Sequence, residues 1–201
     1  VSPYGQSSTQ LDATYEQLNA ALGFKTSPVT GLWFNIYGGY QDLKNNLASA
    51  AIANYSGSYL QLLQGNMHNI YAGAEASYSY KDIISFTASG IYRDWKTAKT
   101  ENNSGDQLLY YMPSFEANFK VDIRPVSSVL INLGYQHITR EKIGNERVDP
   151  VGNLYLGGSY EVFEGISIYV RANNLLNKDY QYYWGYPTEG INFVGGVSFR
   201  F

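Results

Sequence analysis

The fold of this chain is decided by residues 191–201, which read INFVGGVSFRF. Apolar side chains stand at alternate positions, with one glycine in step: Ile191, Phe193, Gly195, Val197, Phe199 and Phe201. The positions between them are mostly polar or small: Asn192, Val194, Gly196, Ser198 and Arg200. A period of two belongs to a β-strand, in which successive side chains point to opposite faces. The segment therefore predicts a strand with one apolar and one polar face.

The same alternation recurs along the whole chain. It predicts nine strands, near residues 12–25, 31–43, 68–80, 83–95, 108–123, 128–140, 152–162, 165–176 and 190–201. Several of these are longer than the roughly five or six residues that are usual in soluble sheets. They have the roughly 9–11 residues that a tilted strand needs to cross a bilayer.

The connections alternate in length as well. Tight turns are expected at 26–30, 81–82, 124–127 and 163–165, and long loops at about 45–67, 96–107, 141–151 and 177–189. Short turns at one end and long loops at the other are typical of an outer-membrane barrel. A soluble β-sandwich or a lipocalin-like barrel is the alternative, but neither has a reason to alternate so regularly. The sequence therefore predicts an all-β fold, an antiparallel transmembrane β-barrel.

The composition agrees with such a barrel. The 201 residues carry a net charge of −3, no cysteine, 20 Tyr and 20 Gly. The aromatic content argues against disorder, and the nearly neutral charge argues against a general affinity for nucleic acid. The lack of cysteine excludes a disulfide scaffold and a cysteine-type zinc site. Many tyrosines fall near predicted strand ends, where amphipathic rings form girdles at membrane interfaces.

No motif for covalent or metal chemistry is found in the sequence. The two histidines, His68 and His137, have no His, Cys or carboxylate at a ligand spacing. No nucleophile elbow, catalytic-triad order or phosphate loop is present. We therefore expect no enzyme, no catalytic residue, no cofactor and no metal site. The strand charges are expected to face a wet or plugged lumen: Glu75, Glu116, Lys120, Asp122, Glu161, Arg171 and Arg200.

A motif lies ahead of the last strand. Residues 174–180 read NLLNKDY at the end of a predicted strand, and residues 185–187 read GYP. This resembles the C-terminal end of TonB-dependent outer-membrane receptors, in which such a motif and an aromatic loop precede the final strand. The family often has Pro-Gly-Arg at the entry to that strand, whereas residues 189–192 read EGIN here. The residues that match the family motif are Asn174, Leu175, Asn177, Tyr180, Gly185, Tyr186 and Pro187.

The last strand also resembles the sorting signal that the barrel-assembly machinery reads. The residues that carry this resemblance are Gly196, Phe199 and Phe201, while Val194 replaces a residue that is usually polar. An unpaired strand with an aromatic face can add to an open sheet edge. The same phenylalanines are also expected to face lipid.

The odd strand count bears on topology. With Phe201 periplasmic, as the resemblance implies, the first of nine strands starts outside the cell, whereas single-chain bacterial barrels have an even count. A tenth strand within residues 1–11, a strand missed within 45–67, or a fragment of a larger barrel would resolve this. We favour the fragment: residues 1–201 would be the C-terminal arc of a barrel with about 22 strands, with no plug domain in this segment.

The resemblance implies ligand uptake across a bacterial outer membrane, with this chain supplying barrel wall and outer loops. The implied partners are outer-membrane lipid, the barrel-assembly machinery, the remaining barrel and plug polypeptide, a TonB-type coupling protein and other outer-membrane proteins. The alternative is a small or partner-completed barrel that serves as a scaffold, complex component or adhesin without transport.

Two of the expected loops are candidates for binding. Residues 45–74 carry no charge, which suits a packed loop, a short helix or hairpin on the barrel rim, or a partner surface. Tyr182, Tyr183 and Trp184 are candidate ligand contacts, because outward aromatic rings can stack on a sugar or a siderophore. Ordinary packing of this loop is the alternative.

Overall fold

The computed structural model describes residues 11–54, 57–97, 108–109, 112–141, 149–183 and 186–200, with the backbone alone at 48–54, 57–63, 183 and 186. One antiparallel sheet contains β1 (Tyr15–Val29), β2 (Leu32–Asn54), β3 (Gly57–Tyr80), β4 (Ile84–Thr97), β5 (Pro113–Ile123), β6 (Val129–Arg140), β7 (Val151–Phe163), β8 (Ile166–Asn173) and β11 (Asn192–Phe199). The short strands β9 (Gln181–Tyr183) and β10 (Tyr186–Pro187) form a separate hairpin. Within these residues, no helix is long and apolar enough to cross a membrane.

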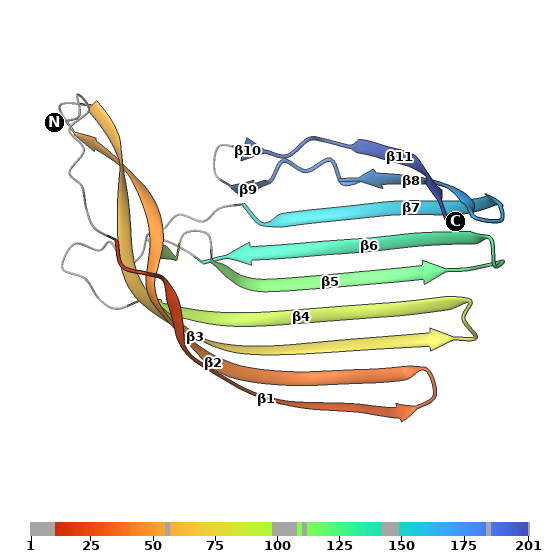
Figure 1. The fold of residues 1–201 in the computed structure, drawn as a ribbon, viewed down its shortest axis with the longest axis horizontal. Helices are drawn as coiled ribbons and strands as arrows, with labels where there is room; N and C mark the ends of the chain where they lie inside the picture. The colour runs from red at the N-terminus through yellow and green to blue at the C-terminus, as the bar shows by residue number, and fades with distance from the viewer. Residues whose placement is uncertain are drawn as a thin grey trace.

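The large sheet is a meander in which each strand pairs with the next one along the chain. The nine strands predicted from the sequence are confirmed in their order. Figure 1 shows the tight turns together at one side of the sheet and the long connections at the other. We call these sides the short-turn end and the long-loop end.

The two margins of the sheet are β1 and β11. All neighbours in the meander are antiparallel, so the first and the ninth strand of the sheet run in the same direction. Figure 1 shows the two margins on opposite sides of the sheet. The sheet therefore cannot close on itself through an antiparallel pair of its own margins.

The tight turns have backbone conformations that suit antiparallel pairing. Between β3 and β4, Lys81 and Asp82 have φ values of 48° and 54°. Two consecutive positive φ values are the type I′ geometry, whose twist matches that of the flanking strands. At the β1–β2 and β7–β8 turns, Gly31 and Gly165 have φ values of 82° and 78°, a region that glycine adopts without strain.

The register separates the two faces of the sheet. One row of directly opposed residues crosses all nine strands and is entirely apolar: Val29, Leu32, Tyr78, Phe86, Val121, Leu133, Leu156, Ala172 and Phe193. A row on the opposite face is entirely polar: Lys25, Asn35, Glu75, Ser89, Asn118, Gln136 and Asn153. We call these the apolar face and the polar face.

The apolar face is open rather than packed against a second layer. Leu22 is 85% exposed and Phe193 is 71% exposed. A monomeric soluble protein rarely leaves so large a continuous apolar surface uncovered. The small buried cluster lies elsewhere, at the long-loop end of the polar face, where Met67, Trp95 and Leu108 pack together.

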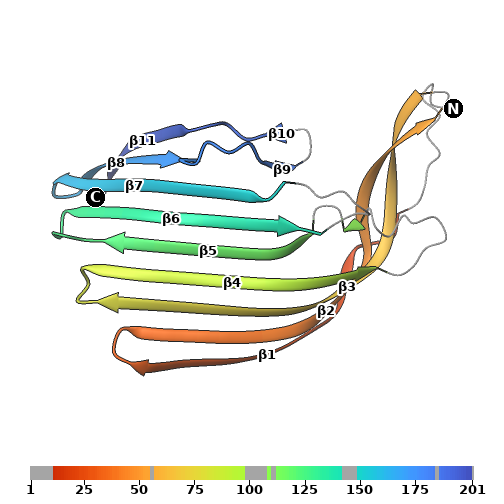
Figure 2. The same cartoon turned by 180° about the vertical axis from the view of Figure 1, so that it is seen from behind.

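The prediction of a loop at residues 45–67 is wrong, because this segment is β-strand. β2 and β3 continue pairing up to Asn54 and Gly57, so this segment is the far part of one long hairpin. A bulge lies between Leu43 and Asn46, where Asn45 has a φ of 55°. Bulges bend a strand, and Figures 1 and 2 show the hairpin turning out of the plane of the sheet beyond the other strands.

Other boundaries also differ from the sequence prediction, among them the end of β1, which continues to Val29 through most of the turn expected at 26–30. The strand expected from residue 108 begins only at Pro113, because Leu108 folds back onto Met67 and Trp95. The Nε1 of Trp95 donates to the carbonyl of Pro113 at 3.0 Å, which fixes this entry to β5. The strand expected to reach residue 176 ends at Asn173, because Asn174 has a φ of 51°.

Candidate functional site

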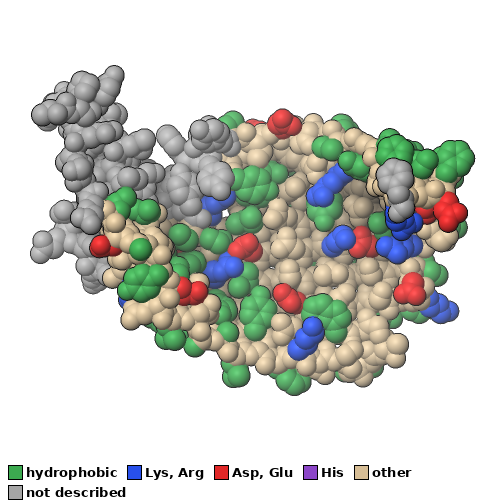
Figure 3. Space-filling view, in the orientation of Figure 1, with side chains coloured by type: hydrophobic (Ala, Val, Ile, Leu, Met, Phe, Trp, Pro, Cys, Tyr) green, Lys and Arg blue, Asp and Glu red, His purple; other side chains and the backbone are tan. Residues whose placement is uncertain are grey.

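The polar face collects the charges that the sequence analysis assigned to it. All seven predicted residues lie on this face by register or by contact: Glu75, Glu116, Lys120, Asp122, Glu161, Arg171 and Arg200. Further charges on this face were missed, among them Lys25, Arg93 and Arg140, although the period of two places them on this face. Figure 3 shows acidic and basic side chains spread over the sheet face turned to the viewer.

These charges form pairs of opposite sign rather than a field of one sign. Arg93 of β4 forms an ion pair with Glu116 of β5. Lys120 lies 2.8 Å from Asp122 on the same strand. At the short-turn end, Arg200 lies 3.5 Å from Glu161. Such mixed charges suit a hydrated wall, since exposed pairs of this kind are compatible with water and add little stability.

Tyrosine rings lie over glycines of the neighbouring strand on this face. Tyr37 covers Gly73, Tyr71 covers Gly39, Tyr155 covers Gly134 and Tyr169 covers Gly196, each opposite its partner in the ladder. A Cβ at the covered glycine would collide with the ring in every pair. The glycines therefore let large rings lie flat along the polar face.

One of these rings carries an arginine. The guanidinium of Arg171 lies 3.9 Å from the centre of the Tyr155 ring, a cation–π arrangement. Its Nε donates to Oδ1 of Asn173 at 2.8 Å. The stack thus runs across three strands, from Gly134 through Tyr155 to Arg171.

The motif at 174–180 is a clamp for the loop ahead of the last strand. Asn174 is buried, and its Nδ2 donates to the carbonyls of Lys178 and Glu189, each at 3.0 Å. Its Oδ1 accepts the backbone N–H of Lys178 at 3.1 Å. One side chain therefore ties the start of the loop to its end.

The other motif residues support the same loop. Asn177, with a φ of 48°, places its Oδ1 3.4 Å from the backbone nitrogen of Ile191. The N–H of Leu175 donates to the carbonyl of Leu154 at 2.9 Å, which anchors the loop to β7. Asparagine tolerates positive φ better than other residues with a side chain, which explains two asparagines at this spacing.

Tyr180 fills the inside of the loop. It is 5% exposed, and its carbonyl accepts both the N–H and the hydroxyl of Thr188. Burial raises the pKa of the Tyr180 phenol, and the neighbouring Tyr182 adds to the rise. The two rings meet edge to face with 5.7 Å between their centres.

The loop is tied down onto the polar face of β6. The hydroxyl of Tyr182 donates to Oε1 of Gln136 at 3.2 Å, and the Arg140 guanidinium donates to the carbonyl of Tyr182 at 3.0 Å. Tyr182 remains 38% exposed. Of the predicted ligand contacts, only Tyr182 is thus placed with its side chain.

The remaining predicted residues are placed in part. Tyr183 pairs with Tyr186 through the backbone of the β9–β10 hairpin, and Pro187 is exposed opposite Gln181. Trp184, Gly185 and Phe201 lie outside the described residues. In the sorting segment, Gly196 lies under Tyr169 on the polar face, and Phe199 is 61% exposed on the apolar face opposite Ile166.

Both histidines lie on the apolar face near the long-loop end, beside aromatic rings. The His68 and Tyr40 rings have centres 5.8 Å apart, and His137 stacks on Tyr135 at 6.3 Å. His137 also shares a hydrogen bond of 2.9 Å with Thr139. Across the described part of the chain, no three His, Cys, Asp or Glu side chains are grouped so that they could hold a metal ion.

Similarity to known proteins is found at the level of structure. Neither the family models nor the curated proteins compared with this sequence match it. Among solved structures, the copper transporter OprC superposes with a TM-score of 0.70 at 18% identity over 91% of this chain and 31% of that one. The ferric-catecholate import receptor Fiu of E. coli K12 superposes with a TM-score of 0.67 at 14% identity. The match covers 95% of this chain and 28% of Fiu.

A different outer-membrane protein also matches. OmpT of Vibrio cholerae superposes with a TM-score of 0.60 at 12% identity, over 90% of this chain and 55% of that one. This chain spans about a third of the length of OprC and Fiu. At these identities the comparisons show the fold: the nine-stranded sheet has the form of an arc of an outer-membrane β-barrel.

Proposed function

We propose that this chain is part of the wall of a TonB-dependent receptor of a bacterial outer membrane, which takes up a ligand from outside the cell. The observation that carries the membrane location is the apolar row across all nine strands, opposed by a polar row on the other face. Alternate lipid-facing and lumen-facing residues are the requirement of a transmembrane barrel.

The apolar face has the height of a membrane. On β3 its apolar positions run from Ile70 to Tyr80, about ten residue steps, or about 34 Å along the strand at about 3.4 Å per residue. At a barrel tilt of about 40° this is about 26 Å in height, close to the apolar band of about 25 Å in such barrels. Charge begins at the outer limit of this band, where Asp94 of β4, opposite Ile70, forms an ion pair of 2.9 Å with Lys96.

Further strands are needed to complete the barrel. The margins β1 and β11 run in the same direction and lie on opposite sides of the sheet. In this proposal, further strands therefore pair with both margins. An unpaired strand edge in a bilayer would leave backbone groups without hydrogen-bond partners, at a cost of several kcal/mol each. The remaining strands, and the plug that would fill the lumen, belong in this proposal to another part of the same receptor.

The receptor assignment rests on the loop clamp. The residues that resemble the receptor motif, Asn174 and Asn177, are those that hold the loop of residues 174–191 in place. In this proposal, three aromatic residues of the loop contact the ligand: Tyr182, Tyr183 and Trp184. Gly196, Phe199 and Phe201 would be read by the barrel-assembly machinery, and the C-terminus would be periplasmic. Energy would come from a TonB-type coupling protein acting on the plug.

A small or partner-completed barrel without transport is the second candidate. It is favoured by the similarity to OmpT of Vibrio cholerae, of which this chain covers 55%. In that case this sheet would be most of a barrel wall rather than a smaller part. The two candidates differ in the length of the polypeptide and in its dependence on energy.

The test is the size and the activity of the protein in its own membrane. An antibody against residues 149–183 should detect, in outer-membrane fractions, a polypeptide much larger than 22.5 kDa. Deleting the coding region should abolish growth on one chelated metal or glycan of a panel, and a protonophore should block the same uptake in the wild type. A polypeptide near 22.5 kDa, or uptake unaffected by the protonophore, would contradict the receptor proposal.

A further inference from the structure

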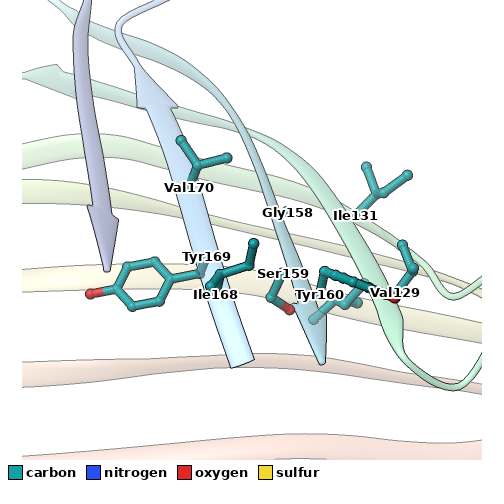
Figure 4. Close-up of a pocket in the computed structure, with 9 residues that line it drawn as sticks. Val129, Ile131, Gly158, Ser159, Tyr160, Ile168, Tyr169 and Val170 are labelled. Atoms are coloured by element: carbon teal, nitrogen blue, oxygen red, sulfur yellow. The ribbon is translucent and has the colours of Figure 1, made fainter. Parts of the chain in front are cut away.

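A groove lies on the apolar face at the short-turn end of β6, β7 and β8. It has a volume of about 270 Å³ and is walled mainly by Val129, Ile131, Tyr160, Ile168 and Val170. Figure 4 shows Ile131 and Val170 on either side, with Gly158 between them. The volume is many times what a single water molecule needs, and no charged residue lines the groove.

The groove exists because Gly158 stands between two bulky neighbours. In the ladder, Gly158 is opposite Ile131 on β6 and opposite Val170 on β8. A Cβ at Gly158 would meet only ordinary contact, 3.5 Å from the carbonyl oxygen of Leu130, so a side chain there has room. The glycine is therefore not required by packing within the chain.

A second glycine on the same face shows the difference. Gly90 of β4 also has room for a side chain, with its nearest neighbour at 3.7 Å. Its ladder partners are Ala74 and Ala117, which are too small to form walls. Thus the two glycines are alike in space and conformational freedom, but only Gly158 is the floor of the groove.

We propose that this groove holds one acyl chain of a phospholipid from the periplasmic leaflet. The inference rests on the proposed membrane location, because the groove is continuous with the face assigned there to lipid. An uncharged apolar lining suits hydrocarbon, because the walls of the groove can make van der Waals contacts with an acyl chain. The leaflet follows from position: Val129 opens β6 and Ile168 lies near the start of β8, both beside the short turns. Tyr160 stands at the same level, where its phenol can meet the headgroup region.

The test compares Gly158→Leu with Gly90→Leu in the intact protein, extracted from its own membrane in a mild detergent. Native mass spectrometry counts the lipids retained per protein, and analysis of the released lipids identifies them. We expect wild type and Gly90→Leu to retain one phospholipid, and Gly158→Leu to lose it at least several-fold. Gly158→Val, with a smaller side chain, should lose it as well.

Other outcomes overturn the inference. If both leucine variants retain the same amount of phospholipid, the groove does not bind it. A retained lipopolysaccharide in place of a phospholipid would also contradict the proposed occupant. Heat-modifiable migration of each variant on a gel shows whether the barrel has formed, and Gly158→Val replaces Gly158→Leu where the latter does not form one. A wild-type protein found in the soluble fraction would instead contradict the proposed function itself, so the two failures are distinguishable.

Discussion

The hydroxyl oxygen of Tyr169 lies 2.6 Å from the point that a Cβ on Gly196 would occupy, so the ring would have to shift to admit any side chain at that position. The two residues are directly opposed on β8 and β11, the last pair of strands in the sheet. The glycine of the predicted sorting segment therefore has a packing role, because it makes room for the ring that lies across the final strand pairing.

Replacing this glycine should destabilise the last strand pair. We expect Gly196→Ala to lower the free energy of unfolding by about 1–3 kcal/mol, as overpacking does, measured by urea unfolding in lipid vesicles. The matched control is Gly90→Ala, where the added methyl has room, and it should cost nothing. A double-mutant cycle with Tyr169→Ala isolates the coupling; the same cost for Gly196→Ala with and without the ring would refute the account.

The loop clamp predicts a local rather than a global effect. Asn174→Ala removes three hydrogen bonds and places alanine at a φ of 51°, which together cost about 3–4 kcal/mol. Because the loss is confined to the loop, limited proteolysis should cut within residues 174–191 at least tenfold faster, while heat-modifiable migration is retained.

Two variants separate the causes of that effect. Asn174→Gly keeps the backbone conformation but loses the hydrogen bonds, so it should recover only about 1 kcal/mol of the loss. Leu176→Ala, at an exposed position of the same loop, should leave the cleavage rate unchanged. A loop that is cut no faster in Asn174→Ala would mean that the side chain does not hold it.

The loop should open at alkaline pH. Burial raises the pKa of Tyr180 above its ordinary value of 10.0, so the phenol gives up its proton more easily when the loop is open. Below pH 10 the Tyr180 phenol is protonated in both the closed and the open loop, and its contribution to the stability of the closed loop is fully present. This contribution is lost as the pH rises through the pKa of Tyr180 in the closed loop. A fluorophore attached at Lys178→Cys should report the opening, and Tyr180→Phe should remove the pH step. A step that persists in Tyr180→Phe would assign it to another group.

The ion pair between Arg93 and Glu116 crosses β4 and β5 on the polar face. Both side chains are partly exposed, 23% and 29%, so the pair contributes little, about 0.5–1 kcal/mol. Arg93→Glu places two carboxylates together and should destabilise by more than Arg93→Ala, whereas Arg93→Glu with Glu116→Arg should restore most of the loss. Urea unfolding of the four proteins measures this; no recovery in the double variant would show that the charges do not interact.

Much of the sheet could be predicted from the sequence, because alternation of apolar and polar residues follows directly from strand geometry. For the segment 45–67, the sequence offered a hairpin only as one alternative to a loop, since its residues are apolar or uncharged at consecutive positions and lose the period of two. The roles of Gly196 and Asn174 also escaped prediction. The role of Gly196 depends on the register that places Tyr169 opposite it. The role of Asn174 depends on backbone carbonyls up to 15 residues away along the chain.

The most direct test of the central claim is a cysteine scan along β3 from residue 70 to residue 80, made in the intact protein in lipid vesicles. The chain has no cysteine of its own, so each spin-labelled variant reports one position. We predict that even-numbered positions, such as Ile70 and Ala74, are accessible to lipid-dissolved oxygen, and that odd-numbered positions, such as Glu75 and Ser79, are accessible to a water-soluble nickel complex. Accessibility without a period of two, or even-numbered positions open to the nickel complex, would contradict a membrane-spanning sheet with its apolar face in lipid.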